Sequence, residues 1–268
     1  MANRHTVMLG FPSGGNVSYY SAMAVFKSSD NHNVTIHPSM NSGGNFNNLW
    51  AGALNLGQEQ KITHFAQLHS DLIVIDTVNG QPAPKWLDVL LDEMDKYDAD
   101  LISVPIAIKD ERGVTSCGIG DPQDPWCPYR RFTVRELGTW PKLPDTFNAA
   151  DMGYGDKFLL HNNGMWVADM RKPLWYKDVN GVSTTVHQFN DQIIRVPQNE
   201  VGKQWVYRRE SEDWTFSRLL HEIGAKTYIT KKVMVNHIGA INFSNWGPWG
   251  TYPHGDEDTA PKWRGDTK

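Results

Sequence analysis

The sequence predicts an α/β protein whose mixed, mainly parallel sheet is covered by helices on both faces. Strand-like and helix-like segments alternate over the first two-fifths of the chain, which is typical of parallel strands joined by crossover helices. No repeat with a period of about 20–50 residues is visible, which excludes solenoids and propellers. The 268 residues are 40% hydrophobic and 21% charged, a usual composition for a globular protein.

The spacing of apolar residues predicts the elements of the first half. Thr6–Phe11 is a short apolar run before Pro12, so we expect a buried strand and then a turn. Apolar residues recur at helical spacing over Phe46–Leu56, and Pro84 opens a second amphipathic segment. The expected strands are 6–11, 33–37, 63–68 and 99–108, and the expected helices are 17–26, 46–56 and 84–94.

The second half is less regular. Gly120–Tyr129 contains three prolines, so we expect an irregular excursion there. Lys157–Asp169 is expected as a strand with a loop, and Glu212–Ile223 as an amphipathic helix before strands at 226–230 and 233–236. Residues 240–268 are rich in Trp and Gly, and we expect a lid or a C-terminal tail.

Composition excludes several classes of protein. Twenty-six Lys and Arg against 30 Asp and Glu give a net charge of −4, which does not favour bulk electrostatic binding to nucleic acid. Apolar stretches such as Leu101–Ile108 fall short of the roughly 20 residues of a membrane span, and no signal-peptide apolar region follows Met1. Two cysteines form neither a disulfide framework nor a zinc site. We therefore expect a soluble, cytoplasmic protein without a membrane span.

Asp71 is the first candidate for chemistry. It follows the apolar run 63–68, and ligands collect beyond the carboxyl ends of parallel strands. A carboxylate there is the hard oxygen ligand that Mg²⁺ or Mn²⁺ takes while bridging phosphates. Capping of the next turn is the simpler explanation of the same residue.

Glu212 and Asp213 form the second candidate, at the start of a predicted helix. The helix dipole stabilises negative charge there by about 0.3–1 kcal/mol, and Ser211 is suited to cap the helix, so capping alone explains the pattern. The functional alternative is that Asp213 is a general base that takes a proton from an acceptor hydroxyl.

His237 is the third candidate. It ends a β-type apolar run and stands two residues before Gly239. Neutral imidazole is a common ligand of divalent metals, although a single histidine at a strand end is more often structural.

The order of these features resembles family-2-like glycosyltransferases of the GT-A fold, over residues 6–239. The shared landmarks are a Pro-containing loop after the first strand, an acidic metal motif, a Pro/Trp-led helix, a glycine-bearing loop at 161–166, a Glu-Asp helix start and a late histidine near glycine. The resemblance implies a catalytic domain over 1–239, with a nucleotide-sugar half at about 1–110 and an acceptor half at about 111–239.

The resemblance also implies roles for individual residues. Asp71 and His237 would hold Mn²⁺ or Mg²⁺ on a nucleoside-diphosphate sugar, a UDP-sugar first of all. Asp213 would be the catalytic base, with Glu212 beside it. The implied donor-binding residues are Pro12, Ser13, Asn47, Asn48, His69, Gly164, Met165 and Trp166. His69 departs from the family, because an acid usually opens the metal motif at that position.

Three functions stay open at this stage. The first is the metal-dependent, inverting glycosyltransferase. The second is a nucleotidyltransferase that makes a sugar nucleotide. The lack of basic residues in the loop at 12–16 counts against it. The third is a non-catalytic module that binds nucleotide sugars. The acceptor is open among saccharides, metabolites and hydroxymethylated DNA bases, the last through a basic stripe that comprises Arg130, Arg131, Arg135, Lys203, Arg208 and Arg209.

Overall fold

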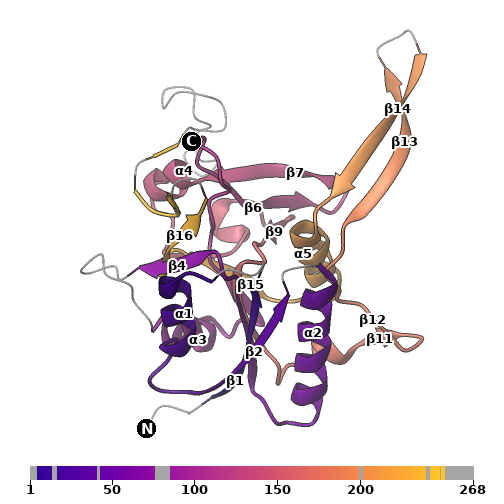
Figure 1. Ribbon diagram of the computed structural model, residues 1–268. Helices are drawn as coiled ribbons and strands as arrows, with labels where there is room; N and C mark the ends of the chain where they lie inside the picture. Colours follow the sequence, from indigo (N-terminus) through magenta and orange to yellow (C-terminus); the bar gives the residue numbers. More distant parts are fainter. Residues whose placement is uncertain are drawn as a thin grey trace.

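A seven-stranded mixed sheet forms the centre of the molecule (Figure 1). The computed structural model describes residues 5–13, 17–40, 43–75, 85–198, 202–239, 242–247 and 249–250. The order of the strands is β2-β1-β3-β10-β5-β15-β8. These strands are β1 (Thr6–Ser13), β2 (Asn33–Met40), β3 (His64–Leu68), β5 (Leu101–Ser103), β8 (Thr146–Phe147), β10 (Met165–Asp169) and β15 (Thr227–Thr230).

The expected mixed α/β class is confirmed, but the expectation of a mainly parallel sheet is not. The pairs β1–β2, β1–β3 and β5–β15 are parallel, whereas β3–β10, β10–β5 and β15–β8 are antiparallel. The difference arises because β10 inserts in the reverse direction between β3 and β5. A run of apolar residues predicts a buried strand without fixing its direction.

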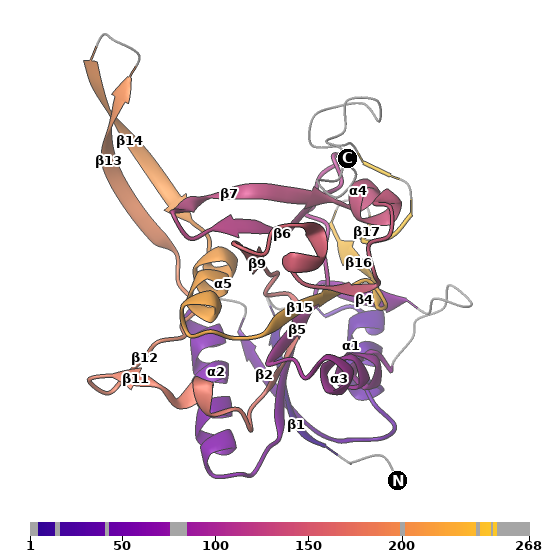
Figure 2. The same ribbon diagram turned by 180° about the vertical axis from the view of Figure 1, so that it is seen from behind.

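Helices cover both faces of this sheet, as the alternation of its side chains requires. Val7 and Leu9 of β1 pack in the cluster that includes α1 and α3, whereas Met8 packs in the cluster that includes α2 and α5. The two groups lie on opposite sides of the sheet in Figures 1 and 2. The helices are α1 (Tyr19–Phe26), α2 (Gly43–Gln58), α3 (Trp86–Tyr97), α4 (Val134–Thr139) and α5 (Glu212–Glu222), with 3-10 turns η1 (Ala150–Met152) and η2 (Pro173–Tyr176).

Two small antiparallel sheets lie beside the central one. One has the order β17-β16-β4 and the other β7-β6-β9. Their strands are β4 (Leu72–Ile75), β6 (Val114–Asp121), β7 (Asp124–Thr133), β9 (Phe158–Leu160), β16 (Met234–Ile238) and β17 (Asn242–Ser244). Two hairpins complete the described elements: β11 (Asp178–Val179) with β12 (Val182–Ser183), and β13 (Asn190–Gln198) with β14 (Gly202–Glu210).

The expectation of an irregular segment at Gly120–Tyr129 is wrong, because β6 and β7 pair through it. Pro125 and Pro128 lie in β7, an edge strand, which is where proline is tolerated in a sheet because it cannot donate to a ladder on both sides. The register also shifts near Gly118–Asp121, which accommodates the interruptions.

The single strand expected over 99–108 is shorter in the structure. Only Leu101–Ser103 joins the central sheet, and Ala107 makes an isolated bridge to Thr115. Pro105 stands between the two pairings and has no N–H to continue the ladder.

Part of the expected C-terminal tail is ordered against the body. Strand β17 pairs with β16, and the Trp249 indole N–H donates to the carbonyl of Ser244 at 3.0 Å. Trp246 is 41% exposed, and Trp263 lies outside the described residues. No helix in the described ranges has the length and apolar character needed to cross a bilayer.

Candidate functional site

Asp71 lies in the turn that joins β3 to β4. The backbone of this turn is fixed from three sides: Ser70 N–H donates to Pro12 C=O (3.2 Å), His69 N–H to Gly164 C=O (2.8 Å) and Leu72 N–H to His69 C=O (3.2 Å). The carboxylate therefore stands at the end of a buried strand, beside the end of β1.

His237 reaches Asp71 through the antiparallel pairing of β16 with β4. Leu72 is opposite His237 in the register, and Ile238 N–H donates to Asp71 C=O at 2.8 Å. The Nε2 atom of His237 lies 3.1 Å from Oδ2 of Asp71. Two residues 166 positions apart thus meet because one strand pair aligns their backbones.

The second ring nitrogen of His237 is also engaged. Nδ1 lies 2.8 Å from the carbonyl oxygen of Ala107, which accepts only if Nδ1 carries a proton. This arrangement directs Nε2 toward Asp71, and it is the outer-shell contact that orients histidine ligands in metal sites.

Lys109 completes the group around Asp71, and the sequence patterns did not predict it. Its Nζ donates to Oδ2 of Asp71 at 2.7 Å. Burial by itself raises the pKa of the Asp71 carboxyl, but hydrogen bonds from His237 and Lys109 outweigh burial and hold this pKa well below its usual range. Asp71 is therefore a carboxylate at neutral pH.

One oxygen of the Asp71 carboxylate is available to bind a further positive partner. Oδ1 of Asp71 is buried and has no hydrogen-bond partner among the described residues. Within the described ranges, no group of three or more His, Cys, Asp and Glu side chains is placed to hold a metal ion. A carboxylate oxygen and an imidazole nitrogen fit a divalent cation that takes its other ligands from substrate phosphates and water.

Loop 161–164 links Asp71 to Asp213. Gly164 C=O accepts from His69, next but one to Asp71, and His161 N–H donates at 2.8 Å to Ser217 Oγ, which in turn donates at 2.7 Å to Asp213 C=O. A side chain at Gly164 would collide with Asn162 and Ile106, because a Cβ there would lie 2.6 Å and 2.8 Å from their side-chain atoms. The absence of a side chain at Gly164 lets the Asn162 and Ile106 side chains pack directly against the loop.

Asp213 and Glu212 open α5, where Ser211 is the N-cap and its Oγ accepts from Trp214 N–H. Burial and, to a smaller extent, the charge of Glu212 raise the pKa of Asp213 to about 7, while the Asn163 backbone and Arg131 oppose the shift. Burial also raises the pKa of Glu212. An aspartate that titrates near neutral pH is suited to accept a proton.

The residues expected to bind a donor do not all lie at this site. Pro12 and Ser13 end β1 beside the Asp71 turn, and His69 stacks on Phe46 at 5.0 Å. Burial lowers the pKa of His69 to about 4, so its ring is neutral at pH 7. Met165 and Trp166 belong to the core, with 0% and 1% exposure, so the expectation that they touch a donor is corrected.

The side chain of Asn47 has a structural role and does not face a donor site as expected. Its Oδ1 accepts from His187 N–H at 2.7 Å, and its Nδ2 donates to His187 C=O at 2.6 Å. Both hydrogen-bonding ends of the amide are thus occupied, whereas the neighbouring Asn48 is exposed. The sequence offered no signal for the buried partner His187.

Buried polar atoms without partners gather behind loop 161–164. Gln67 donates to Asn163 C=O at 2.6 Å, and the Asn163 amide lies 3.0 Å from His187 Nδ1. Within the part of the chain that the structure describes, the atoms without a partner include Gln67 Oε1, Asn163 Oδ1, His161 Nε2 and His187 Nε2. Because buried polar groups normally bond to a partner, this cluster is suited to hold ordered water behind the loop.

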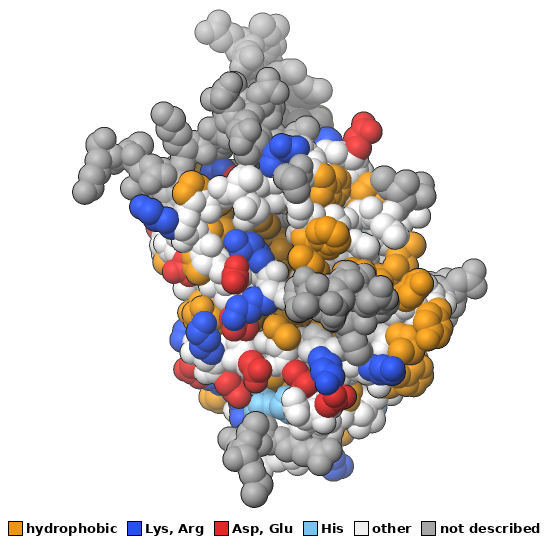
Figure 3. Space-filling model, turned by 90° about the vertical axis from the view of Figure 1, so that its left-hand side faces the viewer, with side chains coloured by type: hydrophobic (Ala, Val, Ile, Leu, Met, Phe, Trp, Pro, Cys, Tyr) orange, Lys and Arg blue, Asp and Glu red, His pale blue; other side chains and the backbone are white. Residues whose placement is uncertain are grey.

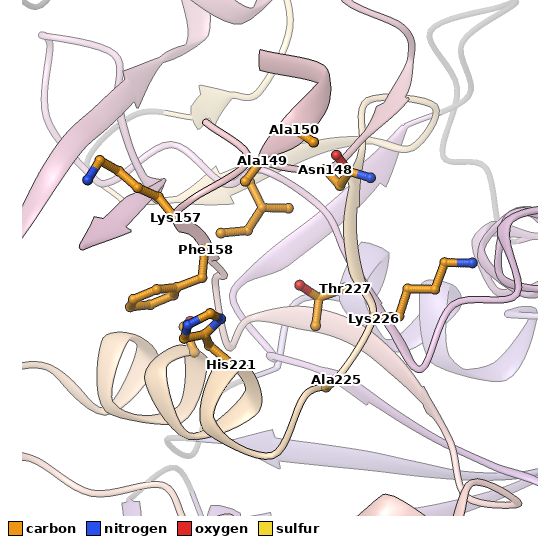
Figure 4. Close-up of a pocket in the computed structure, with 12 residues that line it drawn as sticks. Asn148, Ala149, Ala150, Lys157, Phe158, His221, Ala225, Lys226 and Thr227 are labelled. Atoms are coloured by element: carbon orange, nitrogen blue, oxygen red, sulfur yellow. The ribbon is translucent and has the colours of Figure 1, made fainter. Parts of the chain in front are cut away.

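A cavity of about 220 Å³ lies elsewhere, between α5, β15 and the segment 148–159 (Figure 4). At its edge the rings of Phe158 and His221 stack at 4.9 Å. Its lining residues include none of those predicted for the site, so it is separate from the Asp71 and Asp213 group.

Comparisons with known proteins give no family for this chain. No family model matches it, and no curated protein matches it. Among solved structures, A197 from STIV is similar with a TM-score of 0.47 and 10% identity, covering 87% of this chain and 86% of that one. A likeness at this level assigns neither a family nor a function.

Proposed function

We propose that the protein is a metal-dependent glycosyltransferase that moves a sugar from a nucleoside-diphosphate sugar to an acceptor hydroxyl. One observation carries the proposal: Asp71 and His237, far apart in the sequence, lie 3.1 Å apart, and loop 161–164 bonds both to the Asp71 turn and, through Ser217, to the start of α5. Asp71, which His237 contacts, and the helix that carries Asp213 thus both neighbour one short loop.

Asp71 and His237 are the residues that would hold Mn²⁺ or Mg²⁺, through the unpaired carboxylate oxygen Oδ1 and through Nε2. When bound, a divalent cation supplies positive charge to a departing diphosphate. Lys109 adds a second positive charge at the same place, since its Nζ lies 2.7 Å from Asp71.

Asp213 supplies the base in this proposal. The acceptor hydroxyl gives its proton to the Asp213 carboxylate while its oxygen bonds to the anomeric carbon and the bond to the diphosphate breaks. Attack from the side opposite the leaving group inverts the anomeric configuration. A base with a pKa of about 7 is matched to proton transfer near neutral pH.

A UDP-sugar is the first donor to test, and the acceptor class is open among saccharides, metabolites and hydroxymethylated DNA bases. The basic stripe that would favour DNA is weak among described side chains. Arg130 pairs with Glu136, and Arg208 and Arg209 pair with Asp124 and Asp191; the Lys203 side chain lies outside the described residues. On the face drawn in Figure 3, basic and acidic side chains are interspersed.

The direct test measures release of nucleoside diphosphate from UDP-, GDP- and dTDP-sugars with Mn²⁺ or Mg²⁺. We expect turnover by the native protein and a loss of at least about 100-fold in Asp71→Asn, because the anionic oxygen is removed without a change in shape. Asp92→Asn is the matched control, since Asp92 is exposed on α3. Equal rates for Asp71→Asn and the native protein, or no donor bound at all, would overturn the proposal.

The same assay separates the alternatives. Release of pyrophosphate from a nucleoside triphosphate and a sugar phosphate would identify a nucleotidyltransferase. Tight donor binding without turnover on any acceptor would identify a non-catalytic module.

A further inference from the structure

The segment 107–109 contributes to the Asp71 site through two of its residues. Its backbone is fixed to β6 by an isolated bridge and by an N–H···O=C hydrogen bond of 2.8 Å. The carbonyl oxygen of Ala107 lies 2.8 Å from Nδ1 of His237. Two residues later, the ammonium group of Lys109 donates to Asp71. One fixed stretch of backbone thus orients the histidine and supplies the lysine.

Lys109 is the side chain of this site that can move while the backbone stays in place. Its side chain is 40% exposed, against 31% for Asp71 and 21% for His237. Among the described residues, Asp71 is the hydrogen-bond partner of its Nζ, whereas the His237 ring is held at both nitrogens. Because lysine is a compact charge on a flexible four-carbon stem, Lys109 can leave Asp71 by a change of rotamers alone.

Lys109 stands where it would compete with a divalent cation for Asp71. Its Nζ lies 2.7 Å from Oδ2 of Asp71, and Nε2 of His237 lies 3.1 Å from the same oxygen. A Mg²⁺ ion held by Asp71 and His237 would lie roughly 2.1 Å from its ligand atoms, and hence close to Nζ. Like charges at such a distance repel, and solvent screens the repulsion only in part at a half-buried site. Binding of the cation therefore requires the lysine to leave the carboxylate.

The diphosphate of a nucleotide sugar provides the partner that the released lysine needs. Such a donor carries one negative charge on each of its two phosphates. The pair of Lys109 and Asp71 has no net charge to offer them. With a divalent cation added, the excess of positive charge over the Asp71 carboxylate equals the charge of the diphosphate, provided that Lys109 contributes its ammonium group.

We propose that Lys109 is an exchangeable counter-ion of the Asp71 site, which neutralises Asp71 in the absence of a cation and passes to the donor diphosphate when the cation binds. This inference rests on the proposed function for the identity of the cation and the donor. Its consequence is coupling between the two ligands. Lys109 is available to the diphosphate once it has left Asp71, and a bound diphosphate keeps Lys109 away from Asp71, so each ligand raises the affinity for the other.

The test measures binding of Mn²⁺ alone, and of UDP to the Mn²⁺-loaded protein, by calorimetry on the full chain. Lys109→Met removes the charge and keeps an unbranched side chain. We expect this variant to bind Mn²⁺ alone at least about fivefold more tightly than the native protein, and to bind UDP at least about fivefold less tightly once Mn²⁺ is bound. Lys109→Arg keeps the charge and should stay close to the native protein in both measurements.

Lys172→Met is the matched control, because Lys172 pairs with Asp98 at 2.6 Å away from this site. We expect native affinities for Mn²⁺ and UDP in this variant. A further variant locates the ion: Lys109→Met/Asp71→Asn should lose the tighter binding of Mn²⁺, since the carboxylate that Lys109 releases is no longer charged.

Three results would overturn the exchange. The first is an affinity of Lys109→Met for Mn²⁺ alone that equals or falls below that of the native protein, and the second is unchanged binding of UDP to the Mn²⁺-loaded variant. The third is tight binding of Mn²⁺ that persists in Lys109→Met/Asp71→Asn. These measurements need no turnover, so a protein that shows the exchange and transfers no sugar loses only the enzyme assignment. A protein that transfers sugar while Lys109→Met binds both ligands as the native protein does loses only the exchange.

Discussion

Asp71 and Asp213 are two aspartates whose surroundings move their pKa values in opposite directions. Hydrogen bonds from His237 and Lys109 keep Asp71 ionised, whereas burial and the adjacent Glu212 raise the pKa of Asp213 to about 7, so that it is partly protonated at neutral pH. Carboxylates separated in this way can divide the work of binding a cation and moving a proton. Asp71 and Asp213 are thus suited to different chemistry although both are aspartates.

The raised pKa of Asp213 predicts the acid limb of the pH–rate profile. We expect glycosyl transfer to rise tenfold per pH unit below about pH 7 and to level off above it, because only the carboxylate accepts a proton. Asp213→Asn should lower the rate by about 10²–10⁴-fold and remove this limb. A profile measured from pH 5 to 9 checks both, and a limb centred near pH 4 would contradict the assignment.

The same shift predicts how stability depends on pH. The pKa of Asp213 is higher in the folded state than its ordinary 3.8, so folding binds a proton, and its contribution to stability falls as pH rises from about 4 to about 7. Asp213→Asn removes that loss. We expect the variant to gain stability relative to the native protein between these pH values, measured by urea unfolding at pH 4 and pH 8.

Asn47 makes a testable contribution at the residue scale. Asn47→Ala leaves the buried N–H and C=O of His187 without partners, which we expect to cost about 1–3 kcal/mol of the free energy of unfolding. Asn55→Ala is the control, because Asn55 is exposed on the same helix. Equal urea midpoints for the two variants would contradict a stabilising role for the two Asn47–His187 hydrogen bonds.

At the scale of elements, the N-cap of α5 is directly next to the candidate site residues Glu212 and Asp213. Ser211→Ala removes the side-chain acceptor at the helix start, and we expect it to cost about 0.5–2 kcal/mol and also to lower activity, because Glu212 and Asp213 follow at once. Thr133→Ala is the control, since Thr133 caps α4 in the same way. We expect a similar loss of stability there with unchanged activity; an equal loss of activity in both variants would contradict a local role for Ser211.

Helices and strands were predictable where only one face of the element is buried and where turn residues stand at the ends of the apolar pattern. The periodicity over 46–56 and 212–223 matches α2 and α5, because their apolar stripes pack on the sheet. The prolines near β7 predicted irregularity, since a sequence does not reveal that a strand is an edge. The β13–β14 hairpin was missed because its apolar and polar residues do not alternate in the way that marks a half-buried strand.

At the scale of the whole molecule, the pairing of β4 with β16 joins two distant parts of the chain at one site. A ligand that binds only the folded site therefore stabilises the whole protein. We expect Mn²⁺ with UDP, at about 100 times the dissociation constant, to add about 2.7 kcal/mol to the native protein. His237→Ala should lose most of this gain, whereas His221→Ala, which alters an exposed histidine of α5, should keep it. Thermal melts with and without the ligands measure the difference, and an equal gain in His237→Ala would contradict the site.

The sequence by itself determined the α/β class, the helices with strong apolar stripes and the candidates Asp71, Asp213 and His237, because local spacing and residue chemistry are carried by neighbours in the chain. Tertiary structure alone decided the reversed direction of β10, the burial of Trp166, the clamp of Asn47 on His187 and the arrival of Lys109 at Asp71. These features depend on strand order and on contacts between residues far apart in the sequence. Local periodicity contains no information about such partners, since the same apolar run fits either direction in a sheet.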